Sequence, residues 1–224
     1  EVQGDITPFE LASICAVTKS IVDRLRRDGL VVYEKRTVES DPFEVPAEKE
    51  PPFDLNSEQQ HALDHILEPV NAGIFNVTLL HGVTGSGKTE VYIQAIDHVI
   101  KLGKQAIIMV PEISLTPQMV QRFRARFDGV AVLHSRQTEA QRREQWRCIR
   151  EGKADVVIGP RSAVFAPLPA LGLIVVDEEH ENSFKQDSSP RYNGRDVAIM
   201  RAKLEHAVVV LGSATPSLET FNNC

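Results

Sequence analysis

Short apolar runs alternate with longer amphipathic stretches from residue 55 onward. The runs are rich in Val, Ile and Leu, and they comprise residues 75–80, 106–110, 130–133, 155–158, 173–176 and 207–211. Strands that are covered by helices on both faces of a sheet need apolar side chains on both faces. The runs therefore predict a parallel sheet, and a sheet of this kind binds its ligand at the carboxyl ends of its strands.

The stretches between the runs carry helix signals. Residues 88–102 have apolar positions at helical spacing and end at a glycine. Residues 117–127 follow Thr116, and the T-x-x-Q sequence of residues 138–141 is a capping box for a further helix. Strands that alternate with helices in this way predict a doubly wound α/β fold over residues 55–224.

Residues 1–40 predict a small helical module that ends in a strand. Apolar residues recur at helical spacing, an Asp-Gly turn signal follows, and residues 30–33 are rich in β-formers. This order resembles a winged-helix domain with its recognition helix at residues 18–27. Such domains contact DNA or protein, and the sequence leaves both open. Residues 41–54 are rich in Pro and acids and predict an extended linker.

The 224-residue chain has a formal net charge of -6, but the charge is unevenly distributed. Residues 101–150 hold ten Lys or Arg and four acids, a local balance of +6. This basic zone is compatible with a phosphate-backbone track, and the solvated faces of two amphipathic helices explain it equally well.

Cysteine usage and hydropathy exclude several classes of protein. Three cysteines without a C-x-x-C pair argue against a disulfide framework and against a zinc ribbon in this segment. No apolar run approaches the ~18 residues of a membrane span, and no signal peptide is visible, so we expect a cytoplasmic protein that does not bind membranes.

A complete G-x-x-x-x-G-K-T sequence follows the first predicted strand. The backbone N–H groups of such a loop surround phosphates, the Lys reaches the β and γ phosphates, and the Thr binds Mg²⁺. The chain therefore predicts a site for a nucleoside triphosphate with Mg²⁺. Its residues are Gly82, Thr84, Gly85, Ser86, Gly87, Lys88 and Thr89.

Acidic residues follow the fifth predicted strand directly, in the sequence D-E-E-H. Because the carboxyl ends of parallel strands meet at one edge of the sheet, we expect them beside the phosphate loop. Asp177 is predicted to hold Mg²⁺ together with Thr89, and Glu178 to polarise the attacking water. Lys88, Asp177 and Glu178 are thus the predicted catalytic residues.

Together these motifs resemble helicase superfamily 2, and more specifically the PriA-type primosomal helicases of bacteria. The motifs are G-V-T-G-S-G-K-T-E-V-Y, V-P-E-I-S-L-T-P-Q, G-P-R-S-A, D-E-E-H and G-S-A-T-P-S. The resemblance covers essentially the whole chain and implies a RecA-like motor lobe behind a winged-helix domain. It implies DNA contact or coupling for Pro111, Glu112, Arg161, Ser162, Ser213, Ala214 and Thr215. It also makes Gln59 a candidate for ATP binding, because a carboxamide pairs with both the amino group and N7 of adenine.

The segment after D-E-E-H resembles the aromatic-rich loop of these helicases. Aromatic and basic side chains on such a loop can stack on unpaired bases at ~1–3 kcal/mol per base. Alternatively, Phe184 and Tyr192 pack the loop onto the lobe. The residues predicted to bind DNA or to couple the loop to the carboxylates are His180, Phe184, Lys185, Arg191 and Tyr192.

The resemblance implies an ATP-driven DNA helicase with 3′ to 5′ polarity that restarts replication at stalled or branched forks. Its implied partners are branched and single-stranded DNA, single-strand-binding protein and primosome proteins. The family also has a second lobe with an arginine finger and a zinc-binding insertion, so we expect this chain to be a fragment without zinc and almost without ATP hydrolysis. The alternatives are another superfamily 2 translocase and a winged-helix regulator that is gated by a nucleotide.

Overall fold

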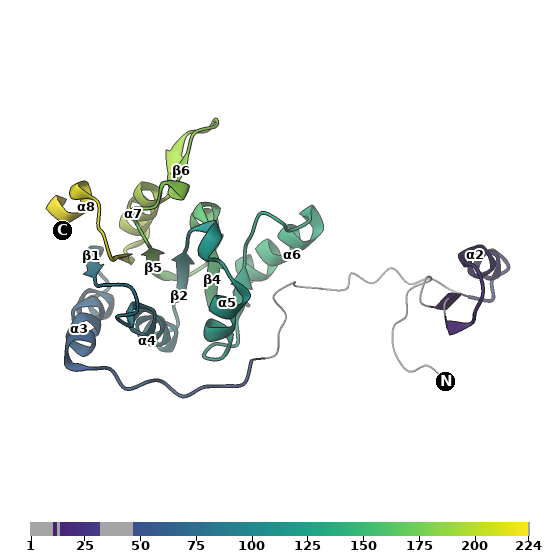
Figure 1. Cartoon of the computed structure of the whole chain (residues 1–224), viewed down its shortest axis with the longest axis horizontal. Coiled ribbons are helices and arrows are strands. Elements are labelled where there is room, and N and C mark those ends of the chain that lie inside the picture. Colours follow the sequence, from purple (N-terminus) through teal and green to yellow (C-terminus); the bar gives the residue numbers. More distant parts are fainter. Residues whose placement is uncertain (1–10, 13, 32–46, 224) are drawn as a thin grey trace. The chain divides into compact units, whose positions relative to one another are not determined.

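The computed structural model describes residues 11–12, 14–31 and 47–223. The chain divides into two compact units, residues 1–39 and residues 40–224 (Figure 1). Within the described residues, no helix is long and apolar enough to cross a membrane.

The smaller unit contains the helix predicted at residues 18–27, which is α2 (Lys19–Arg27) with Thr18 as its N-cap. Val22 is buried on one side of it. Leu30 and Val31 form a bend and not the start of a strand, and the other two residues of the predicted strand lie outside the described residues. The helix is therefore confirmed, while the winged-helix assignment and its boundaries stay a prediction.

A six-stranded parallel sheet forms the centre of the larger unit within residues 47–223, with the strand order β1-β8-β5-β2-β4-β3. The strands are β1 (Asn76–His81), β2 (Gln105–Met109), β3 (Val130–Val132), β4 (Val156–Gly159), β5 (Leu171–Asp177) and β8 (Val208–Ser213). Each predicted apolar run corresponds to one of these strands. The predicted α/β fold with a parallel sheet is confirmed.

Helices cover both faces of this sheet (Figure 1). Alternate side chains of a strand point to opposite faces, so Ile108 of β2 enters one apolar cluster and Ile107 the other. A fully buried aliphatic side chain contributes about 1.5–3 kcal/mol, so these two clusters supply most of the stabilisation. One face is covered by α3 (Ser57–Ala72), α4 (Lys88–Lys101) and α5 (Pro117–Arg124), and the other by α6 (Glu139–Arg150) and α7 (Gly194–Glu205).

Short elements follow the carboxyl ends of the strands. The 3₁₀ helices are η1 (Glu112–Ser114) after β2, η2 (Arg161–Phe165) after β4 and η3 (Asn182–Phe184) after β5. An antiparallel hairpin of β6 (Lys185–Gln186) and β7 (Tyr192–Asn193) comes next, and Figure 1 shows it projecting from the lobe. The last element is α8 (Leu218–Asn223). These connections bring the predicted motifs to one edge of the sheet.

Residues 47–54, the described part of the predicted linker, have no regular secondary structure but lie against the lobe. The Lys49 ammonium is 2.6 Å from a carboxylate oxygen of Asp128. The Glu50 N–H donates to the Ala125 carbonyl at 3.1 Å, and the Gln94 side chain donates to the Phe53 carbonyl at 2.8 Å. This segment is therefore held along the lobe and is not a free tether.

Candidate nucleotide and nucleic-acid sites

The phosphate-binding loop joins β1 to α4. Gly85 and Gly87 have φ angles of 79° and 84°, a left-handed conformation that side-chain-bearing residues rarely adopt. A Cβ on Gly87 would also collide with the Gln59 carboxamide. The loop thus turns the chain so that the N-terminus of α4, with its free N–H groups and positive dipole end, faces the site.

Lys88 starts α4 and bends back over the loop. Its ammonium donates to the Gly82 carbonyl at 2.6 Å and to the Val83 carbonyl at 3.3 Å. These contacts hold a positive charge above the backbone that is predicted to surround the phosphates. The role of Lys88 at the β and γ phosphates stays a prediction.

The two predicted catalytic carboxylates end β5. Asp177 Oδ1 accepts a hydrogen bond from the Tyr92 hydroxyl at 3.1 Å. Burial, and then the charge of Glu178, raises the pKa of Asp177. Glu178 has a φ of 51°, which is uncommon for a residue other than glycine and is typical of strained positions in active sites.

The Tyr92 contact requires a glycine on the neighbouring strand. The Tyr92 ring is 1% exposed, and a Cβ on Gly212 of β8 would collide with its hydroxyl. Tyr92 therefore connects the helix after the phosphate loop to Asp177 across a gap that Gly212 leaves open. Sequence reasoning missed this residue, although Tyr92 belongs to the same motif as Lys88.

A cleft of about 610 Å³ contains the phosphate loop and both carboxylates. Of the predicted residues it is lined by Thr84, Gly85, Gly87, Lys88, Thr89, Asp177 and Glu178. Its lining also includes Phe53, Arg122 and Arg126, which were not predicted. Nothing local in the sequence indicates them, because they reach the cleft through the packing of α5 and of residues 47–54.

The cleft offers oxygen atoms that suit Mg²⁺. Thr89 and Asp177 line it together, and only one oxygen of Asp177 is occupied by Tyr92. Burial and then the charge of Glu178 raise the pKa of Asp177, and a divalent cation would offset the repulsion between the two carboxylates. Since Mg²⁺ binds through one or two carboxylates and the substrate phosphates, this pair of residues fits the ion.

Gln59 lies beside the phosphate loop and is not among the residues that line the cleft. Its amide donates to the Ser86 carbonyl at 2.8 Å, and its carbonyl accepts from the Asn56 N–H at 2.9 Å as half of a capping box for α3. Both ends of the carboxamide are engaged in this arrangement. Adenine recognition by Gln59 stays a prediction, and it requires the side chain to leave at least one of these partners.

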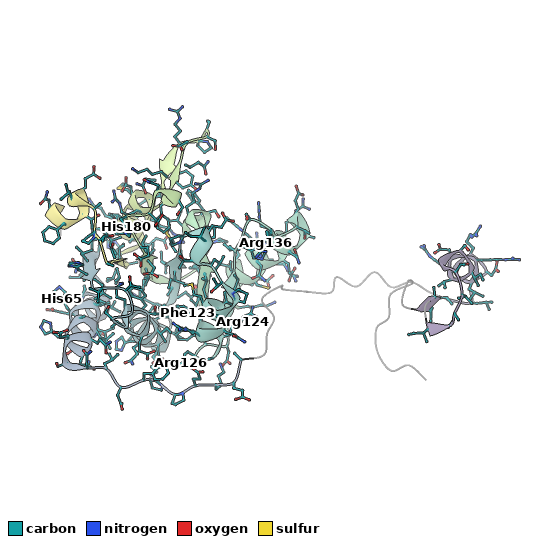
Figure 2. The ribbon with its side chains drawn as sticks, viewed as in Figure 1. His65, Phe123, Arg124, Arg126, Arg136 and His180 are labelled. Atoms are coloured by element: carbon teal, nitrogen blue, oxygen red, sulfur yellow. The ribbon has the colours of Figure 1, made fainter. Side chains whose placement is uncertain are left out.

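The S-A-T motif, residues 213–215, contacts the D-E-E-H sequence through His180, which Figure 2 labels. His180 Nδ1 is 2.8 Å from Ser213 Oγ and 3.7 Å from a carboxylate oxygen of Glu178, and its Nε2 is 3.3 Å from Thr215 Oγ1. Ala214, the third predicted residue of the motif, has its carbonyl 3.3 Å from His81 Nε2. The structure thus brings His180, Ser213 and Thr215 into one hydrogen-bonded group next to Glu178, while Ala214 contacts His81 instead.

A buried ion pair lies behind this group. The Glu179 side chain is 0% exposed and accepts from Arg195 Nη1 at 3.1 Å, from the Thr220 hydroxyl at 2.9 Å and from the Ser217 N–H at 2.8 Å. Burial raises the pKa of Glu179, but these hydrogen bonds outweigh burial and the pKa is lowered. The sequence shows the acid but not its partners, which lie 16 to 41 residues away.

The aromatic-rich loop has a buried root and an exposed tip. Phe184 is 1% exposed and belongs to an apolar cluster, so its ring does not face solvent where a base could stack. For Phe184 the packing alternative therefore describes the structure. Lys185 and Arg191 are exposed, and Tyr192 is half-buried with its ring 5.3 Å from that of Phe165.

A second cleft, of about 370 Å³, lies between the hairpin and the ends of β2, β3 and β4. We call it the hairpin cleft; its lining includes the predicted DNA-contact residues Glu112, Arg161, Ser162 and Tyr192. Arg161 Nη1 donates to the carbonyls of Ser183 and Lys185 at 3.1 and 2.8 Å, which fixes the root of the hairpin. Pro111 is next to Glu112 but is not part of the lining.

The basic zone of residues 101–150 is divided between the two faces of the sheet. Arg126, which Figure 2 labels, pairs with Glu90 of α4 at 3.0 Å, and both residues line the nucleotide cleft. Arg142 of α6 lines the hairpin cleft instead. Basic residues of the zone therefore line two separate clefts, Arg122 and Arg126 one and Arg142 the other.

Comparison with known proteins decides the family. Residues 56–224 match the family model described as DEAD/DEAH box helicase. The chain belongs to this helicase family. It is 45% identical over 218 residues to the replication restart protein PriA of Bacillus subtilis (strain 168). The aligned region covers 96% of this chain and 27% of that protein. It is 52% identical over 174 residues to PriA of Chlamydia pneumoniae, covering 77% of this chain and 23% of that one.

A solved structure supports the fold. RecG bound to a three-way DNA junction has a TM-score of 0.55 and 27% sequence identity, over 76% of this chain and 22% of that chain. The predicted resemblance to PriA-type helicases and the predicted RecA-like lobe are confirmed. The chain spans about a quarter of the length of the PriA relatives.

Proposed function

We propose that this chain is the nucleotide-binding lobe of an ATP-driven DNA helicase that restarts replication at stalled or branched forks with 3′ to 5′ polarity. Two features of the site support this proposal. The phosphate loop, Thr89 and the two carboxylates line one cleft, and His180 contacts both Glu178 and the S-A-T motif. A cleft that only bound a nucleotide would not need that connection. The regulator alternative is not favoured, because the family match is a helicase over residues 56–224.

The residues of the cleft suggest how hydrolysis is arranged. Lys88 and the N-terminus of α4 neutralise the β and γ phosphates, and Glu178 orients the attacking water. Thr89 and Asp177 would hold Mg²⁺, which supplies charge neutralisation at the transferred phosphate when it is bound. In this proposal His180, Ser213 and Thr215 respond to the loss of the γ phosphate because they contact Glu178 or its neighbours.

Fast ATP hydrolysis also requires groups from other parts of the full-length protein. A cation from a second lobe raises the rate of phosphoryl transfer by about 10³-fold or more in enzymes of this kind. We therefore propose that the 224-residue chain binds ATP but hydrolyses it very slowly, and that any zinc belongs outside these residues. Branched and single-stranded DNA, single-strand-binding protein and primosome proteins are the proposed partners, in the bacterial cytoplasm.

Lys88→Ala in the full-length protein tests the proposal. Without the ammonium the γ phosphate loses its only lysine contact within the loop, so ATP hydrolysis should fall to background while binding to forked DNA persists. Lys101→Ala is the matched control, because Lys101 ends the same helix, is exposed and pairs with Asp97. Normal hydrolysis by Lys88→Ala would refute the nucleotide site.

A further inference from the structure

The hairpin cleft has a wall that no sequence motif indicated. Trp146, the single tryptophan of the chain, lines it from α6 and is partly buried against the apolar cluster of that face of the sheet. Arg142, one helical turn earlier, also lines the cleft. Its guanidinium is exposed and has no hydrogen-bond or ion-pair partner in the part of the chain that the structure describes.

The cleft is a separate site. None of its lining residues also lines the nucleotide cleft. It contains no phosphate loop, and Glu112 is its single acid among the described residues. Its lining combines the cation of Arg142 and the ring of Trp146 with mostly uncharged polar side chains, which does not resemble a triphosphate site.

Hydrogen bonds hold the other walls in place. Gln137 donates to the Val132 carbonyl at 2.8 Å and accepts from the His134 N–H at 3.2 Å, which shapes the exit of β3. Gln186 donates to the Pro190 carbonyl at 3.0 Å and so fixes the hairpin. The cleft is therefore formed before a ligand enters, which lowers the entropic cost of binding.

The chemistry of this lining suits one unpaired nucleotide. A base has a π-face for Trp146 and an edge for the polar side chains, and the phosphate next to it suits the free guanidinium of Arg142. A volume of about 370 Å³ is near the lower end of small-molecule sites and leaves room for one nucleoside. Arg161 and Tyr192, for which DNA contact is predicted from the sequence, line the same space.

We propose that the hairpin cleft captures one unpaired base of the DNA strand, stacked on Trp146 with its phosphate at Arg142. The proposal rests on the proposed function, since it takes DNA as the track. A captured base lies against the root of the hairpin, and η3 connects that root to D-E-E-H within a few residues. A base bound in the cleft could therefore shift the D-E-E-H residues of the ATP site through η3.

The experiment measures binding of the full-length protein to forked DNA whose unpaired arm carries one abasic site, moved by one nucleotide at a time. One position should weaken binding about 5- to 150-fold, which is the ~1–3 kcal/mol of a stacked base at ~1.4 kcal/mol per tenfold. In Trp146→Leu, which retains apolar packing on the core, that penalty should disappear. A penalty that is independent of position, or that persists in Trp146→Leu, overturns the proposal.

Arg142→Ala tests the phosphate contact independently of whether Trp146→Leu folds. Removing one phosphate contact should reduce the slope of log binding constant against log salt by about 0.7 for a single strand. Arg143→Ala is the matched control, because Arg143 is the next residue, is exposed, pairs with Glu139 and does not line the cleft. Equal slopes for both variants overturn the phosphate contact.

Two further outcomes separate this proposal from the proposed function. A wild-type protein that binds no forked DNA refutes the function itself, whereas tight binding without an abasic penalty refutes only the cleft. An abasic penalty that is found with an RNA arm and not with a DNA arm would overturn the assignment of DNA as the ligand.

Discussion

Glu179→Gln would show how much the buried ion pair behind the ATP site stabilises the lobe. The substitution keeps the shape of the side chain and removes its charge. In the protein, one carboxylate oxygen accepts from both Arg195 and Thr220, and the other accepts from the Ser217 N–H. An amide has a single acceptor oxygen, so an NH₂ group must face either the first two donors or the third.

The expected destabilisation follows from burial. Breaking a buried ion pair by removing one partner costs about 3–5 kcal/mol. Arg195 is 13% exposed and has Asp196 at 3.0 Å as another partner, so we expect a cost about 1 kcal/mol below that range, about 2–4 kcal/mol. For a domain of 150–250 residues, 1 kcal/mol corresponds to about 2–4 °C. The melting temperature should therefore fall by about 5–15 °C.

Thermal unfolding of the 224-residue chain, followed by circular dichroism at pH 7, measures this fall. Glu139→Gln is the control, because Glu139 is 86% exposed and its pair with the exposed Arg143 is worth less than about 1 kcal/mol. A loss of less than 2 °C in Glu179→Gln would refute the reasoning.

The pH dependence gives a second check on the same residue. The pKa of Glu179 in the folded protein lies below its ordinary value of 4.5. Its contribution to stability is therefore fully present above that value and is lost as the pH falls through the folded pKa. The difference between wild type and Glu179→Gln should be constant near neutral pH and should shrink below about pH 4.5.

Three further predictions follow from the geometry of the sites. Tyr92→Phe removes only the hydroxyl that donates to Asp177, so the Mg²⁺ concentration needed for tight binding of a fluorescent ADP should rise several-fold. Binding of the same ADP in EDTA should stay the same, and an unchanged Mg²⁺ dependence contradicts this role. Asp177→Asn should raise the melting temperature of the metal-free protein at pH 7. The pKa of Asp177 is raised in the folded protein, so ionisation of this carboxyl lowers the free energy of unfolding as the pH rises through that pKa, and the gain from the amide should vanish toward pH 3.8. Phe184→Ala should cost about 3–5 kcal/mol as a buried aromatic, whereas Tyr192→Ala should mainly reduce DNA-stimulated ATP hydrolysis; similar melting temperatures for the two variants would contradict the separation.

Most of the fold could be predicted from local patterns. The strands are recognisable because each is apolar on both faces, and each supplies side chains to two clusters, as Ile107 and Ile108 do. The phosphate loop and the residues around Asp177 are recognisable because their chemistry lies within a few consecutive residues. Topology then brings them together, since both follow parallel strands of one sheet.

What could not be predicted depends on contacts between distant residues. The partners of Glu179 come from α7 and from the segment after β8, and only packing brings them to the carboxylate. The composition of residues 47–54 predicts a linker, but backbone hydrogen bonds to α4 and to Ala125 hold the segment in place. An aromatic residue on a loop, such as Phe184, has the same sequence signal whether it is buried or exposed.

The central claim, that this lobe drives a DNA motor, is tested most directly by ATP turnover of the full-length protein with and without DNA. The hydrogen bonds that join His180 to Ser213 and Thr215 beside Glu178 predict that DNA stimulates hydrolysis. The proposed role at forks predicts that forked DNA does so more strongly than linear duplex. The Lys88→Ala protein should show no turnover with either DNA. Hydrolysis at the same rate with forked DNA, linear duplex and no DNA would contradict the account.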